Sequence, residues 1–131
     1  SHTHLSGTGV SDYGDILFAP TVGEIIYHNG ADETPGYSSI FSHEKEIAEA
    51  GFYQVFLEDY KINVSLTTSQ RAGFHKYTFP KSDQSNIIID LEHRDEVLES
   101  EIEIIGNNEL VGFRRSNSWA TDQHIYFVAR F

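Results

Sequence analysis

The first fifteen residues hold the densest group of side chains that could bind a polar ligand. They contain two histidines, His2 and His4, together with hydroxyl groups, three glycines and two aspartates. Glycine adopts positive φ at little cost and lets a backbone approach a ligand closely. The composition therefore predicts a polar loop that brings imidazole and hydroxyl groups to a ligand.

The spacing within this loop disfavours a self-contained metal or phosphate site. His2 and His4 would share one face of a strand, but no third metal ligand is identifiable. Asp12 and Asp15 offer oxygens that Ca²⁺ accepts, yet they lack the alternating pattern of a calcium loop, so turn-capping aspartates are favoured. The Gly7-Thr8-Gly9 segment has no following Lys and no strand-to-helix pattern. Hydrogen-bonding histidines are the expected outcome.

The single tryptophan, Trp119, lies in a polar stretch that begins at Arg114 and contains Asn and Ser. An indole ring offers an apolar face for the C–H groups of a sugar, and the polar neighbours offer hydrogen bonds to its hydroxyls. The competing interpretation, which carries more weight, is an aromatic plug at a sheet edge whose N–H bonds to backbone. Both interpretations stay open on the sequence.

Other catalytic patterns carry little signal. Ser65, His75 and Asp90 are residue types of a hydrolase triad, but no serine lies in a G-x-S-x-G turn. The chain has 20 acidic residues, so some pair suitable for glycoside chemistry is inevitable and indicates nothing. We predict no catalytic residue from these patterns.

Composition excludes several classes of function. The 131 residues include no Cys, which rules out thiol catalysis, disulfides and thiolate metal sites. The net charge is −11, so the basic surface that binds nucleic acid is missing. The apolar runs are far shorter than the ~20 residues of a membrane helix. Because Met is absent and Ser is first, we expect the natural chain to begin upstream, and to continue past Phe131.

Alternating apolar and polar residues predict an all-β chain, an antiparallel β-sandwich, with a closed barrel as the alternative. We expect one domain without repeats. Pro20 is expected to end the first strand, and the apolar residues 86–91 to form a central strand covered on both faces. Residues 42–50 contain good helix formers, but an extended segment is favoured. The expected strands are residues 15–20, 24–27, 52–57, 62–68, 74–79, 86–91, 100–105, 109–115 and 124–131.

Several motifs in collinear order resemble the N-terminal domain of glycoside hydrolase family 92. The resemblance extends over nearly the whole chain, and its opening nonapeptide and Ser-His-Glu-Lys-Glu block are the most specific parts. The motifs are SHTHLSGTG at 1–9, YGDIL at 13–17, Pro20-Thr21, FSHEKE at 41–46, TFP at 78–80 and YFVA at 126–129.

This resemblance implies a β-sandwich of the galactose mutarotase-like supersandwich type, of which residues 1–131 are a part. In such enzymes the sandwich packs on an (α/α)₆ domain, with the active site between them. They are Ca²⁺-dependent exo-α-mannosidases whose catalytic carboxylates and main Ca²⁺ ligands belong to the helical domain. The resemblance therefore implies no catalytic residue, no metal ligand and no cofactor in this chain.

The resemblance also implies an inverting hydrolysis of α-mannosides, with α-1,2 linkages expected, in N-glycan degradation. The expected partners are a mannose-containing glycan and the helical domain, and the expected location is periplasmic, cell-surface or secreted in a bacterium. Val10 and the segment 49–52 depart from the family pattern, which leaves subsite detail open. A stand-alone carbohydrate-binding module and a structural scaffold are the alternatives. The substrate-binding candidates are His2, His4, Ser6, Gly7 and Trp119.

Overall fold

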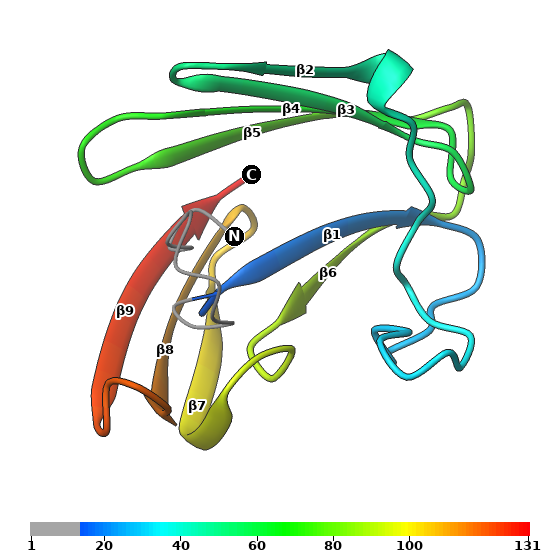
Figure 1. Ribbon diagram of the computed structural model, residues 1–131. Coiled ribbons are helices and arrows are strands. Elements are labelled where there is room, and N and C mark those ends of the chain that lie inside the picture. The colour runs from blue at the N-terminus through cyan, green and yellow to red at the C-terminus, as the bar shows by residue number, and fades with distance from the viewer. Residues whose placement is uncertain (1–13) are drawn as a thin grey trace. The chain divides into compact units, whose positions relative to one another are not determined.

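The computed structural model describes residues 14–131, and this part of the chain is almost entirely β, which confirms the predicted fold class (Figure 1). One short 3₁₀ helix, η1 (His43–Lys45), interrupts the strands. Among the described residues no helix is long and apolar enough to cross a membrane. The strands are β1 (Leu17–Val22), β2 (Glu46–Glu49), β3 (Phe52–Leu57), β4 (Ile62–Thr68), β5 (Gly73–Thr78), β6 (Ser85–Asp90), β7 (Glu96–Ile105), β8 (Glu109–Asn117) and β9 (Gln123–Arg130).

The described residues divide into two compact units. One unit contains residues 18–88, and the other contains residues 14–17 together with residues 89–131. The first unit holds the four-stranded sheet in the order β2-β3-β4-β5, and the second holds the three-stranded sheet in the order β7-β8-β9 (Figure 1). Each unit is therefore described by itself.

The four-stranded sheet is an antiparallel meander whose strands follow the sequence pattern closely. Residues 62–68 alternate between apolar and polar side chains, and this segment forms β4 with the predicted bounds. Val55 of β3 lies opposite Val64 of β4, and with Ile62 they form the buried core of this unit. Lys61 ends the tight β3–β4 turn with a φ of 55°. Because side chains alternate between the two faces of a strand, the apolar residues of β4 all lie on the buried face of the sheet.

Residues 42–50 are mostly extended, as favoured, but not throughout. Ser42 caps the 3₁₀ turn by accepting a hydrogen bond from the Glu44 backbone N–H at 3.3 Å. Strand β2 begins directly afterwards, and Ile47 pairs with Gln54 of β3. The available edge of β3 gives these residues a hydrogen-bonding partner, which outweighs their helix propensity.

Three local predictions are wrong. Pro20 does not end the first strand, because β1 runs to Val22; among the described residues β1 pairs only with β6, and an edge strand tolerates a residue without N–H. In the described part of the chain β6 has only β1 as a partner, so it is not a central strand. Residues 24–27 form no strand, because no neighbouring backbone pairs with them in the sheets.

The three-stranded sheet is built from two hairpins. Gly106, with a φ of 65°, turns the chain between β7 and β8 as the Gly-Asn-Asn sequence predicts. A register shift between Val97 and Glu99 marks a bulge in β7. From Glu99 to Ile105, β7 is paired residue by residue with β8, which fixes the face that each side chain occupies.

Candidate functional site

The predicted ligand-contacting residues fall into two groups. His2, His4, Ser6 and Gly7 lie outside the described residues. Trp119 is described, and it lies in the turn between β8 and β9 with 75% of its surface exposed. An indole that is exposed to this extent does not plug a sheet edge, so its ring is open to a ligand.

The polar groups beside Trp119 differ from those that its sequence neighbours suggest. Arg114 is fully buried and offers no hydrogen bond to a surface ligand. The exposed polar cluster is formed instead by Asp122, which accepts a hydrogen bond from Arg115 Nε at 2.6 Å and lies 3.1 Å from His124 Nε2. The Arg115 hydrogen bond, followed by the His124 contact, lowers the pKa of Asp122. The turn therefore presents an aromatic ring and a charged cluster.

Arg114 is the centre of a buried polar network that the sequence did not reveal. Its Nη1 donates to Asp15 Oδ1 at 2.8 Å, and its Nε donates to the carbonyl oxygen of Leu91 at 2.5 Å. Its Nη2 donates to the carbonyl oxygen of Arg94. Asp95 Oδ2 lies 3.7 Å from Nη1. One guanidinium thus links the segment before β1, the segment before β7 and the middle of β8.

Asp15 has a structural role instead of the turn-capping role predicted for it. Its side chain is almost completely buried, and Oδ1 accepts a second hydrogen bond from Gln123 Nε2 at 2.6 Å. A Cβ on Gly14, directly before it, would lie 2.9 Å from Cδ of Arg94, so that flexible side chain would have to shift. No sequence signal could have identified this network, since Asp15 and Arg114 are 99 positions apart.

The described residues offer no ligand set for a cation. Among residues 14–131, no three His, Asp or Glu side chains gather in an arrangement that could hold a metal ion. The carboxylate of Asp15 is already paired, because it lies 2.8 Å from Nη1 of Arg114.

The triad that the sequence disfavoured is not assembled. Ser65 Oγ donates to Gln54 Oε1 at 3.2 Å, and His75 Nδ1 lies 2.6 Å from the hydroxyl of Tyr77. Burial raises the pKa of Tyr77 to about 12, so this hydroxyl stays protonated at neutral pH. Neither residue is arranged as a nucleophile and its base.

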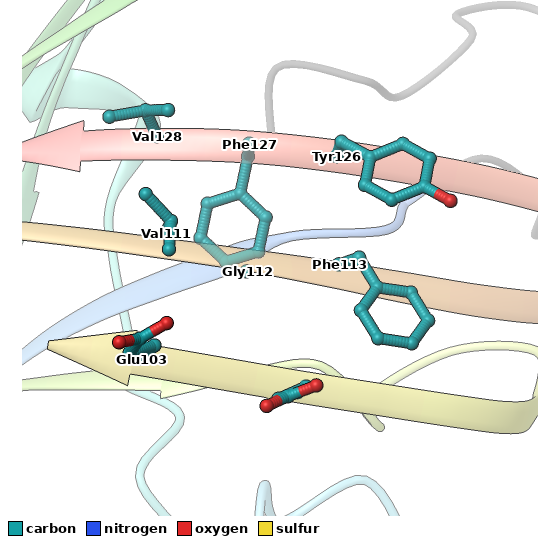
Figure 2. Close-up of a pocket in the computed structure, with 8 residues that line it drawn as sticks. Glu103, Val111, Gly112, Phe113, Tyr126, Phe127 and Val128 are labelled. Carbon is teal, nitrogen blue, oxygen red and sulfur yellow. The ribbon is translucent and has the colours of Figure 1, made fainter.

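A shallow hollow of about 440 Å³ lies on the three-stranded sheet (Figure 2). The rings of Phe113 and Tyr126, on neighbouring strands, stack with centroids 5.8 Å apart and planes 26° from parallel. Carboxylates from β7 stand beside them. The hollow is within the size range of small-ligand sites. Its lining residues are Glu101, Glu103, Val111, Gly112, Phe113, Tyr126, Phe127 and Val128.

The described residues form antiparallel sheets, with an exposed aromatic side chain in the turn between β8 and β9, so the fold defines an all-β domain. The family comparison makes this specific: the model of the glycosyl hydrolase family 92 N-terminal domain matches residues 1–131, and the chain belongs to this family. This finding confirms the family that the sequence motifs indicated.

Solved structures agree with the assignment. The chain is similar to the family GH92 α-mannosidase BT3965 from Bacteroides thetaiotaomicron, with 38% identity, a TM-score of 0.90 and 98% of this chain covered. A second structure of that enzyme, in complex with mannoimidazole, matches equally well. The chain spans only 18% and 17% of these two solved chains. No curated protein sequence matched.

Proposed function

We propose that this chain forms part of the N-terminal β-sandwich of an exo-α-mannosidase and contributes one wall of its substrate cleft. The observation that carries the proposal is the family match over residues 1–131, together with 38% identity to an α-mannosidase that was solved with mannoimidazole. The segment with His2, His4, Ser6 and Gly7 is the proposed cleft-facing element. Imidazole and hydroxyl groups there would bond to the hydroxyls of mannose.

The proposed division of labour leaves the chemistry to another part of the protein. Inversion requires a carboxylic acid that protonates the leaving oxygen and a carboxylate that activates water, ~6.5–9.5 Å apart. The described residues contain no metal cluster, so we place the Ca²⁺ ligands and the two carboxylates in a C-terminal helical domain. This chain would supply orientation, which lowers the barrier by holding the sugar in place.

The biological setting is part of the same proposal. We infer a bacterial enzyme that acts in the periplasm, on the cell surface or outside the cell, where it degrades N-glycans. The bond we expect it to cleave is the α-1,2 linkage to a terminal mannose. The resemblance to the family is the basis of this setting, and the α-mannosidase BT3965 supports a mannoside as substrate.

The experiment compares mannose release from α-1,2-mannobiose by the 131-residue chain and by the full-length protein. We expect the full-length protein to release mannose, to lose activity with a calcium chelator, and to regain it when Ca²⁺ is restored. The chain alone should release none. Substitution His4→Ala in the full-length protein should raise KM or lower kcat. Mannose release by the purified chain, or unchanged kinetics of His4→Ala, would contradict the proposal.

A stand-alone carbohydrate-binding module is the second candidate, and the exposure of Trp119 favours it. Titration calorimetry of the isolated chain and of its Trp119→Ala variant with mannose and α-mannobiose tests this function, because a module would bind sugar through Trp119 without its partner domain. Substitution Trp119→Ala should then abolish the heat of binding. A scaffold role is the third candidate, favoured by exposed apolar side chains such as Ile40 and Phe74.

A further inference from the structure

The three-stranded sheet has two chemically different faces. Cross-strand partners occupy the same face, and successive residues alternate between faces. Arg114 and Leu110, both buried, belong to one face. Phe113 and Tyr126, which are paired with each other and with Glu101, belong to the opposite face, which we call the Tyr126 face. Its cross-strand rows are Glu99-Arg115-His124, Glu101-Phe113-Tyr126, Glu103-Val111-Val128 and Ile105-Glu109-Arg130.

The Tyr126 face combines charge with exposed apolar surface. Every one of its four rows contains at least one charged side chain, which is typical of a face in contact with water. Yet Tyr126 is 74% exposed and Val128 is 61% exposed in the middle of this face. The exposed ring is held in place by its stacking on Phe113. The face therefore presents a fixed aromatic surface to the solvent.

Two carboxylates lie along the same hollow. Glu101 is in the row of the two rings, and Glu103 is in the next row, so both belong to the acidic edge that β7 gives to this face (Figure 2). Neither Glu101 nor Glu103 is buried. A hollow with an aromatic wall and a carboxylate edge matches a ligand that has both C–H surfaces and hydroxyl donors.

The chemistry of the face distinguishes among occupants. An anionic ligand would be repelled by Glu99, Glu101, Glu103 and Glu109, which outnumber the two arginines of the face. An apolar protein surface would bury the carboxylates of Glu101 and Glu103 without partners, which is unfavourable because a buried charge needs hydrogen bonds or an opposite charge. A neutral sugar satisfies both requirements, because its hydroxyls donate to carboxylates and its C–H groups pack on a ring.

We propose that the Tyr126 face binds a neutral oligosaccharide. Tyr126 and Phe113 supply the stacking surface, and Glu101 and Glu103 accept hydrogen bonds from sugar hydroxyls. The site contains none of the residues from 2 to 7 and does not contain Trp119. It goes beyond the proposed function, since it would hold a glycan chain without acting on it.

The test is a titration of the ¹⁵N-labelled chain with α-1,2-mannobiose and mannotriose, followed by amide chemical shifts. We expect saturable shifts that are largest at residues 101, 113 and 126. Substitution Tyr126→Ala should weaken binding at least tenfold, and Glu101→Gln should weaken it as well. Phe74→Ala removes a ring from the other unit that is 65% exposed, against 74% for Tyr126, and is the matched control. Circular dichroism verifies that each variant folds.

Each other outcome contradicts the site. Absence of saturable shifts with mannotriose overturns it, as does binding that survives Tyr126→Ala and is lost in Trp119→Ala. Shifts of this face that depend on protein concentration without sugar would assign it to self-association instead. The proposed function fails by a different result, namely the lack of mannose release by the full-length protein, so the two failures are distinguishable.

Discussion

Replacing Arg114 by Met should cost far more stability than any other single loss of charge in the described part of the chain. Met keeps the length of the side chain and removes the guanidinium, which donates to Asp15 and to two backbone carbonyl groups. Asp15 and Asp95 are both almost fully buried, so two carboxylates lose a neighbouring positive charge. Removing one partner of a buried ion pair costs about 3–5 kcal/mol.

The neighbouring arginine provides a matched control. Arg115 forms a salt bridge with Asp122 at 2.6 Å, but both side chains are exposed. Exposed ion pairs contribute little to stability, so Arg115→Met should barely change the free energy of unfolding. The two substitutions remove the same chemical group from adjacent positions of β8 and differ in burial and in partners.

Urea unfolding, monitored by tryptophan fluorescence and circular dichroism, measures both losses. The midpoint should fall strongly for Arg114→Met and barely for Arg115→Met, with similar m-values. The double variant Arg114→Met/Asp15→Asn should recover part of the lost free energy of unfolding, because the amide that replaces the Asp15 carboxylate leaves no buried charge. The coupling free energy between the two substitutions should be ~0.5–3 kcal/mol. Equal losses for the two arginine substitutions would refute the argument.

Three further outcomes follow from the packing and the pKa shifts. Burial and, second, the hydrogen bond to Glu46 raise the pKa of Tyr53 to about 12. Burial also raises the pKa of Tyr77 to about 12. A pH titration that follows tyrosinate absorbance should therefore show both residues ionising at higher pH than the exposed tyrosines. Both pKa values lie above the value of about 10 that tyrosine has in the unfolded chain. The neutral hydroxyls therefore contribute their full stability below pH ~10, and this contribution is lost as the pH rises through about 12. Urea unfolding midpoints measured across this pH range test the loss. Burial also lowers the pKa of His93, so its imidazole NMR signals should titrate below those of an exposed histidine. Gly112→Ala should destabilise by ~1–3 kcal/mol in thermal unfolding, since the new Cβ would lie 2.6 Å from a backbone oxygen and 2.8 Å from the Phe127 ring.

The sequence predicted the parts of the fold that depend on neighbouring residues. Strand β4 has the predicted bounds because its alternation selects one face without reference to the rest of the chain. The Gly106 turn was identified for a similar reason, since Gly accepts the positive φ that the hairpin needs. The family was also readable, because its motifs are short and occur in a fixed order.

Strand pairing produced the departures from prediction. Pro20 stays within β1 because, among the described strands, β1 pairs only with β6, and residues 24–27 stay irregular because none of these strands pairs with them. Residues 46–49 have good helix propensity, yet they pair with β3. Local propensity is worth tenths of a kcal/mol to about 1 kcal/mol per residue, so an available partner strand decides these cases.

The candidate site residues also differ in whether the sequence or the tertiary structure identified them. The sequence by itself determined that Trp119 lies in a polar turn and that His2 and His4 belong to a family motif. Only the tertiary structure decided that Arg114 is buried against Asp15, and that Tyr126 and Phe113 stack beside Glu101 on one face. The physical reason is that periodicity and turn chemistry reside in adjacent residues, whereas the register between strands sets which distant side chains meet.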